Sequence, residues 1–168
     1  EAEALGASGG STALRAATLT GTEVGPETVL DPRVCDCCQT AAATTPRGAF
    51  VAYRDRSDKE VRDVSYVRLV EGRWTEPRSF ADDGWQIDGC PVNGPAISAI
   101  GRNVPAAWLV AKNDQGQAFA AFSQDAGRTW GQPIRLDDAA SLGKGEIEML
   151  DDGSAVAAWT EFANQRPP

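Results

Sequence analysis

An internal repeat of 51 to 56 residues constrains the fold of this chain more than any other feature of its sequence. One mark of the repeat is a proline that follows a strand end. It occurs at Pro26, Pro77 and Pro133, which are 51 and 56 residues apart. Short β-type runs between these prolines are bounded by Gly, Asp, Asn and Pro, and no window favours a helix. The pattern therefore predicts an all-β fold built from repeated units.

A second mark keeps the same phase: a run of small apolar residues that ends in an aromatic residue. The aromatic residues are Tyr53, Trp108 and Trp159, which are 55 and 51 residues apart. About four short strands in a repeat of this length are typical of a β-propeller blade. The expected division is 11–30 for the outer two strands of one blade, 39–80 for a second blade, 95–136 for a third, and 145–162 for the inner two strands of a fourth.

About three blades are fewer than the roughly four to eight of a closed propeller. A partial ring would leave two apolar sheet faces exposed, which is a large patch for a soluble monomer. The sequence therefore predicts completion of the ring by missing sequence or by a second copy. Residues 1–10 are expected to form a flexible segment, with an expression scar at 1–4 as one interpretation, and 163–168 a tail.

Composition narrows the class of partner. The chain has 168 residues, 42% of them hydrophobic, and a net charge of −8, which fits one globular domain of 11–162. Nucleic acid and anionic membranes need clustered Lys and Arg, so we expect neither as a partner. No run approaches the roughly 20 apolar residues of a transmembrane helix.

The cysteines are unusually placed, because Cys35, Cys37 and Cys38 lie together and Cys90 lies far downstream. A bridge between Cys37 and Cys38 is disfavoured, since neighbouring Cα atoms are about 3.8 Å apart and a disulfide needs roughly 4.4 to 6.8 Å. Two pairings remain. We prefer Cys35 to Cys38 with Cys37 to Cys90 over Cys35 to Cys37 with Cys38 to Cys90.

A thiolate-bound metal is the alternative to two disulfides. Four sulfurs suit zinc, and two or three suit monovalent copper, in a chain that has no His and one Met. A redox-active pair of Cys35 and Cys38 is a third interpretation. No cofactor is firmly predicted, and zinc or copper is the metal to consider.

The third repeat contains a recognisable motif, Ser-x-Asp-x-Gly-x-Thr-Trp, the Asp-box pattern. Its residues are Ser123, Asp125, Gly127, Thr129 and Trp130. Asp-boxes are hairpin turns of sialidase-like propellers, and Ser, Asp and Gly at these offsets suit a turn held by side-chain to backbone hydrogen bonds. We expect a structural role for all five residues.

The wider sequence resembles bacterial exported proteins described as sialidase-like or Asp-box (BNR) repeat proteins. The resemblance covers nearly the whole chain from about residue 11 and includes 35–40, 53–56 and 89–95. In that family this region is the later half of a longer propeller with an export signal. The resemblance therefore implies a periplasmic or secreted protein of which this chain is a part.

Sialidase activity is the second hypothesis that the resemblance raises. Such enzymes use three arginines, a Tyr nucleophile with a Glu behind it, an Asp acid/base, and an early Arg-Ile-Pro, which this chain lacks. The local candidates are Arg54, Asp55, Arg56 and, more weakly as a nucleophile, Tyr53. We favour a non-catalytic binding module, with an exo-sialidase-like glycoside hydrolase and a protein-interaction scaffold as alternatives.

Propeller topology places several polar groups on one face, around the central channel. The connections that hold 35–38 and 90–94 and the turn 54–63 should converge there, where propellers bind ligands. A carbohydrate or another small ligand is the expected partner, apart from a chain that closes the ring. The candidate ligand-binding residues are Asp36, Gln39, Arg62, Asp63, Trp85, Asn93, Glu146 and Glu148.

Overall fold

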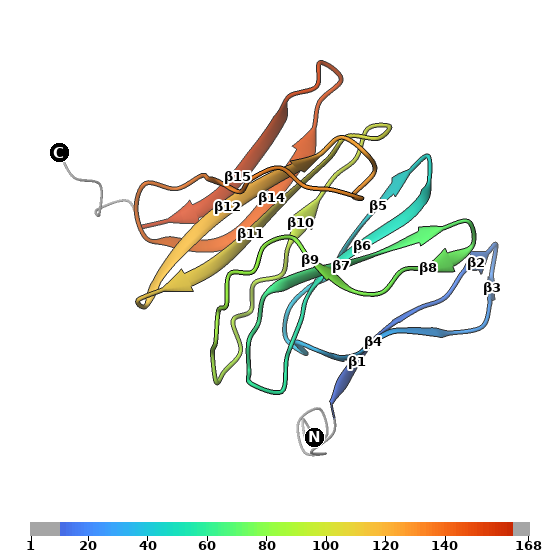
Figure 1. Cartoon of the computed structure of the whole chain (residues 1–168), viewed down its shortest axis with the longest axis horizontal. Helices are drawn as coiled ribbons and strands as arrows, with labels where there is room; N and C mark the ends of the chain where they lie inside the picture. The colour runs from blue at the N-terminus through green and yellow to red at the C-terminus, as the bar shows by residue number, and fades with distance from the viewer. Residues whose placement is uncertain (1–10, 163–168) are drawn as a thin grey trace.

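The chain folds into a series of antiparallel β-sheets (Figure 1). The computed structural model describes residues 11–162, and this range contains strands and loops but no α-helix. The all-β prediction is therefore confirmed. Expectations for 1–10, including the scar at 1–4, and for 163–168 lie outside the described residues. No helix in the described range is long and apolar enough to cross a membrane.

The described part of the chain begins with a long hairpin. Its base pairs β1 with β4, and its tip pairs β2 with β3. The strands are β1 (Thr12–Ala16), β2 (Leu19–Thr20), β3 (Glu23–Val24) and β4 (Thr28–Val34). The second sheet has the order β5-β6-β7-β8, and β9 also pairs with β7. Its strands are β5 (Ala41–Thr45), β6 (Gly48–Arg54), β7 (Val64–Val70), β8 (Arg73–Trp74) and β9 (Arg78–Ser79).

The third sheet repeats the four-strand order of the second, as β10-β11-β12-β13. Its strands are β10 (Ala96–Ile97), β11 (Val104–Lys112), β12 (Gln115–Ser123) and β13 (Ile134–Arg135). The last sheet has two strands, β14 (Ser141–Met149) and β15 (Ala155–Glu161). The sheets follow one another in chain order through the molecule, and the described residues do not close into a ring (Figure 1).

Each sheet packs on the next because successive side chains of a strand point to opposite faces. In β6, Phe50 and Ala52 face the core shared with the third sheet, whereas Val51 and Tyr53 face the first hairpin. A third cluster, with Ile147 from β14, joins the third and fourth sheets. The period of two in the sequence thus produces three layers of apolar side chains between the sheets.

The largest of these layers is aromatic and lies between the second and third sheets. Phe50 stacks on Tyr66 with ring centroids 5.1 Å apart, and Phe80 meets Trp130 edge to face at 4.6 Å. Trp108 also lies in this layer, 5.7 Å from Phe80. Aromatic pairs add roughly 0.5 to 1.5 kcal/mol beyond area burial, so this layer is a major source of stability.

The turn after β12 is held by its own side chains. Ser123 Oγ accepts the N–H of Gly127 at 2.8 Å, and Asp125 Oδ1 accepts the N–H groups of Arg128 and Thr129 at 3.0 and 2.8 Å. Thr129 Oγ1 donates to Asp125 Oδ2 at 2.7 Å. Partial burial opposes ionisation of Asp125, but these hydrogen bonds outweigh it and lower the pKa to about 2. These contacts suit a structural turn, whereas its identity as an Asp-box stays a prediction.

Candidate functional site

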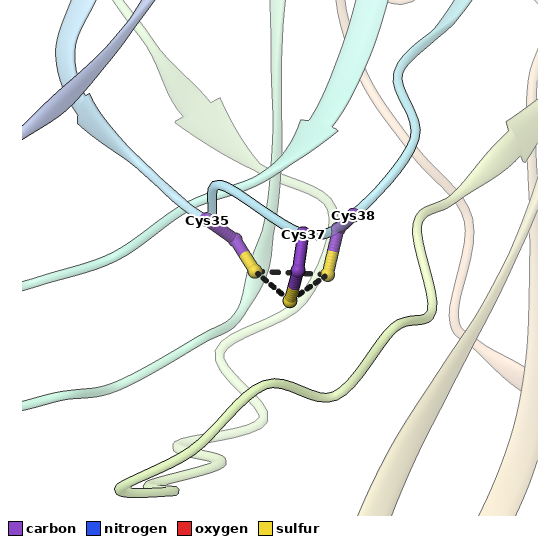
Figure 2. Close-up of side chains that lie close together, drawn as sticks. All are labelled: Cys35, Cys37 and Cys38. Carbon is purple, nitrogen blue, oxygen red and sulfur yellow. Dashed lines mark hydrogen bonds between the residues drawn. The ribbon is translucent and has the colours of Figure 1, made fainter. Parts of the chain in front are cut away.

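The site is centred on the connection between β4 and β5, which holds three of the four cysteines. Cys35 follows the last residue of β4, and its N–H donates to the carbonyl of Arg54 at 3.0 Å. This bond continues the pairing of Val34 with Asp55 and fixes where the connection starts. Figure 2 shows the three side chains of the connection pointing toward one another.

The sulfur atoms form a compact group, all within 4.8 Å of one another. Cys35 Sγ lies 2.9 Å from Cys38 Sγ and 3.5 Å from Cys37 Sγ, and Cys37 Sγ lies 4.0 Å from Cys38 Sγ. Cys37 forms a disulfide with Cys90, whereas Cys35 and Cys38 are free thiols. Three sulfurs thus meet, one of them in a bridge.

The preferred disulfide pairing is therefore half correct. The bridge from Cys37 to Cys90 is present. The predicted bridge from Cys35 to Cys38 is not formed, because their sulfurs are 2.9 Å apart and a disulfide bond is about 2.05 Å long. The two sulfurs are instead within hydrogen-bond distance, so Cys35 and Cys38 remain thiols that can react or bind a metal.

The two thiols are electrostatically unequal. The hydrogen bond from Cys38, opposed by burial and helped by Cys37 and Arg62, lowers the pKa of Cys35 to about 6. The same hydrogen bond, together with burial, raises the pKa of Cys38. Arg62 Nη1 donates to Cys35 Sγ at 3.3 Å, and Arg54 is close enough to Cys38 for its charge to favour the thiolate. The two sulfurs thus lie beside two cations, and the hydrogen bond between them favours the thiolate at Cys35 rather than at Cys38.

Glu60 organises the arginines beside the thiols. Its carboxylate accepts Arg62 Nη2 at 2.7 Å, Arg56 Nη2 at 3.1 Å and Arg33 Nη2 at 3.3 Å. The hydrogen bonds from Arg56 and then Arg62 lower the pKa of Glu60 to about 2. The sequence analysis missed Arg33 and Glu60. Arg33 stands two residues before Cys35, but Glu60 has a left-handed φ of 58° that nothing in the sequence indicates.

Arg54 does not project into solvent as the arginine of a substrate site would. Its side chain is 1% exposed and donates to the carbonyls of Arg62 at 2.6 Å, Leu109 at 2.8 Å and Asn93 at 2.5 Å. Its guanidinium carbon lies 4.8 Å from the ring centre of Trp85. Burial lowers the pKa of Arg54. All of its donor groups are thus directed at the protein itself.

The other catalytic candidates lie around Arg54 but face different surroundings. Tyr53 is 1% exposed and donates to Asp31 Oδ2 at 2.6 Å, and burial followed by Asp31 raises its pKa. Asp55 is half-buried, and burial raises its pKa. Arg56 is half-buried and bonded to Glu60. These groups do not meet in one accessible pocket.

The three predicted connections come together, since Arg62 of the turn 54–63 contacts Cys35, whereas their place around a propeller channel stays a prediction. The disulfide joins the first connection to the second, and the N–H of Gly94 donates to Gln39 Oε1 at 3.0 Å. A Cβ at Gly94 would lie 1.9 Å from the carbonyl oxygen of Gln39, so only glycine permits this approach. Asn93 is buried, its N–H group interacts with the sulfur of Cys38, and its Oδ1 accepts the N–H of Lys144 at 2.7 Å.

The remaining ligand-binding candidates divide into buried and exposed groups. Asp63 accepts the N–H groups of Gly84 and Trp85, both at 2.9 Å, and so shapes the next loop. Trp85 is buried, at 9% exposed, and the guanidinium of Arg54 lies over its ring, so this candidate offers little surface to a ligand. Asp36 is exposed. Glu146 and Glu148 are exposed on one face of β14.

Comparison with known proteins gives limited information. No protein-family model matches the chain, and no curated protein matches it. A solved structure that it resembles is the "Hadza microbial sialidase Hz136", at 25% sequence identity and a TM-score of 0.43. The match covers 68% of this chain and 30% of that chain, so this chain spans less than a third of that protein.

Proposed function

We propose that this chain is part of an exported, sialidase-like β-propeller protein whose Cys35 and Cys38 form a non-catalytic binding site for monovalent copper. The observation that carries the proposal is the pair of free thiols 2.9 Å apart, one buried and one partly exposed, at a junction of two connections beside a disulfide. The in-phase repeat and the self-bonded turn at 123–130 support the propeller. The sheets' order along the chain supports it too.

Copper(I) suits this pair better than zinc does. A structural zinc site takes four ligands, most often Cys and His, but this chain has no His and two of its four cysteines are in the bridge of Cys37 and Cys90. Soft thiolates select monovalent copper, which needs fewer ligands. Two thiolates and one Cu⁺ carry a net charge of −1, and Arg62 and Arg54 stand beside the two sulfurs to balance it.

The geometry argues against a sialidase-type reaction at the candidates from the sequence. A substrate carboxylate needs accessible guanidinium groups, but Arg54 is buried and bonded to three backbone carbonyls. A nucleophilic Tyr must reach the substrate, but Tyr53 is buried against Asp31. Arg56, Arg62 and Arg33 share one internal carboxylate, Glu60. A binding module is therefore the better supported function.

Export and ring closure complete the proposal. A structural disulfide such as Cys37 to Cys90 persists in oxidising compartments, which supports a periplasmic or secreted location. The outer face of the β14 and β15 sheet exposes Leu142 and Val156, and the first hairpin exposes Leu19 and Val24. Burial of these faces needs further sequence or a second copy, and the mass in solution distinguishes the two.

Titration of the protein with Cu⁺ against a chromophoric Cu⁺ chelator tests the copper site. We expect one Cu⁺ per chain, with loss of binding in Cys35→Ser and in Cys38→Ser. The matched control is Cys37→Ser with Cys90→Ser, which removes the disulfide but keeps the dithiol, and it should retain one Cu⁺. Absence of competition with the chelator, or equal affinity in Cys35→Ser, would overturn the proposal.

A further inference from the structure

A second chemistry is available to these cysteines, because a dithiol lies against a disulfide of the same chain. Cys35 Sγ is 3.5 Å from Cys37 Sγ, the sulfur that is bonded to Cys90. Cys38 Sγ is 2.9 Å from Cys35 Sγ. The chain thus holds an attacking thiol, the sulfur that it would attack, and a third thiol close to the attacker.

We infer that the four cysteines form a relay that passes two electrons from the pair Cys35 and Cys38 to the exposed Cys90 by thiol–disulfide exchange. Cys90 then reduces a low-molecular-weight disulfide. This inference goes beyond copper binding and does not need it. Cys35 is 5% exposed, whereas Cys90 is exposed at the surface, so the relay carries reducing equivalents from the interior to solvent.

The first step breaks the existing bridge. Cys35 gives its proton to water and its thiolate attacks Cys37 Sγ. The bond between Cys35 and Cys37 forms, the bond between Cys37 and Cys90 breaks, and Cys90 leaves with the electron pair and takes a proton from water. Cys90 is a suitable leaving group because its exposed thiolate is hydrated. It lies in the segment between β9 and β10, which has no strand of its own.

The geometry favours Cys35 over Cys38 as the attacking thiol. Cys38 lies farther from Cys37, at 4.0 Å, and its attack would form a bridge between neighbouring residues. Neighbouring Cα atoms are about 3.8 Å apart, below the range of roughly 4.4 to 6.8 Å that a disulfide prefers. Arg62 holds Cys35 through a contact of 3.3 Å to its sulfur. Cys35 is therefore the attacking thiol, and Cys38 is the thiol that resolves the new bridge.

The second step releases Cys37 from its bridge with Cys35. Cys38 gives its proton to water and attacks Cys35 Sγ, so that the bond between Cys35 and Cys38 forms and the bond between Cys35 and Cys37 breaks. Cys37 takes the electron pair and a proton. The net change moves two electrons and two protons from Cys35 and Cys38 to Cys37 and Cys90, and it consumes no oxidant or reductant.

The last steps reduce the external disulfide, R–S–S–R. The Cys90 thiolate attacks one of its sulfurs, forms a mixed disulfide and releases one R–S⁻. Cys37 then attacks Cys90, restores the bridge between them and releases the second R–S⁻. Cys35 and Cys38 end as a disulfide, and two molecules of R–SH are formed. The protein completes one such turnover for each dithiol.

Labelling with a maleimide attached to polyethylene glycol tests the internal steps, without added reductant. Trypsin separates Cys90, in the peptide 79–102, from the other cysteines, in the peptide 34–47. We expect Cys90 to be labelled at least about tenfold faster in the native protein than in Cys35→Ser, because only the native protein has the attacking thiol. Equal rates, or no label on Cys90, would overturn the relay.

A second variant keeps the test decisive if Cys35→Ser folds poorly. In Cys38→Ser the exchange should stop after its first step, with label on Cys90 and a bridge between Cys35 and Cys37 that leaves the peptide 34–47 unlabelled. Absence of this product would overturn the relay. With oxidised glutathione as the probe, the double variant Cys37→Ser, Cys90→Ser should release glutathione about tenfold more slowly than the native protein. Equal release would show direct reaction at Cys35 and refute the relay.

The double variant also separates the two proposals. It should bind one Cu⁺ whether or not the relay exists, because its dithiol is intact. A protein that binds no Cu⁺ but labels Cys90 through Cys35 would leave the relay standing without the copper site. A protein that binds one Cu⁺ but does not label Cys90 through Cys35 would support the copper site without the relay.

Discussion

Arg54 joins two sheets, and its removal should reveal how much of the stability that junction carries. The side chain leaves β6 in the second sheet and donates to Leu109 in β11 of the third sheet and to Asn93 in the segment before it. Its other bond, to Arg62, stays within the second sheet. In Arg54→Met the volume is similar, but three buried carbonyl oxygens lose a charged donor.

The expected cost follows from these bonds. Each unsatisfied buried acceptor costs about 1 to 3 kcal/mol, which gives roughly 3 to 9 kcal/mol for the three carbonyls. The variant no longer buries a charge, and water can enter, so the lower half of this range applies. We expect a loss of about 4 kcal/mol in the free energy of unfolding, which is comparable with removing one partner of a buried ion pair.

Urea-induced unfolding measures this loss, followed by far-UV circular dichroism. Tryptophan fluorescence alone would be misleading, because Arg54 covers Trp85. The matched control is Arg128→Met, which removes the same charge from an exposed side chain and should cost less than about 0.5 kcal/mol. A loss below about 1 kcal/mol in Arg54→Met would refute the account of Arg54 as the link between the sheets.

Two further predictions concern the junction loop and the turn after β12. Gly94→Ala should lower the free energy of unfolding by about 1 to 3 kcal/mol, because the new Cβ would lie 1.9 Å from the carbonyl oxygen of Gln39. Gly89→Ala is the control and should change stability little, because the nearest atom to its Cβ would be 3.8 Å away. Thermal unfolding of the two variants measures the difference. Asp125→Ala should lower the free energy of unfolding, measured in urea, by about 1 to 2 kcal/mol, because the hydrogen bonds of the carboxylate are lost. The control Gln124→Ala should leave the free energy of unfolding nearly unchanged. Because the folded state lowers the pKa of Asp125 to about 2, its contribution is complete above about pH 4 and is lost as the pH falls toward 2. A constant difference between native protein and Asp125→Ala across that interval would contradict this account.

The phase of the repeat made most of the fold predictable. Pro26, Pro77 and Pro133 recur one or two residues before a strand begins, at β4, β9 and β13. Trp108 occupies the buried layer that its apolar run indicates. Strand pairing needs only local alternation and turns, both of which the sequence displays. Closure into a ring stays a prediction, because the described residues 11–162 do not close into one.

The candidate site was less predictable, because Arg54 was expected among groups that reach a substrate and is instead buried. A signal for Arg54 was available: Phe50, Ala52 and Arg54 lie two residues apart on one strand, and a strand extended by one step places Arg54 on the buried face. No such signal exists for Trp85, which lies between β9 and β10, where no strand sets a period. Its burial follows from contacts with Arg54 and Asp63 that only the folded chain brings together.

These contacts explain why the cysteine site sits at the junction of the second and third sheets. Arg54 binds the carbonyl of Asn93, while the N–H of Asn93 interacts with Cys38, so the group that joins the sheets also positions one sulfur. A ligand that binds only the assembled site stabilises the folded state by an amount that grows with its free concentration. Copper(I) should therefore stabilise the native protein against urea. Arg54→Met should weaken both the junction and the site, whereas the double variant Cys37→Ser, Cys90→Ser should lose the disulfide and keep the response to copper.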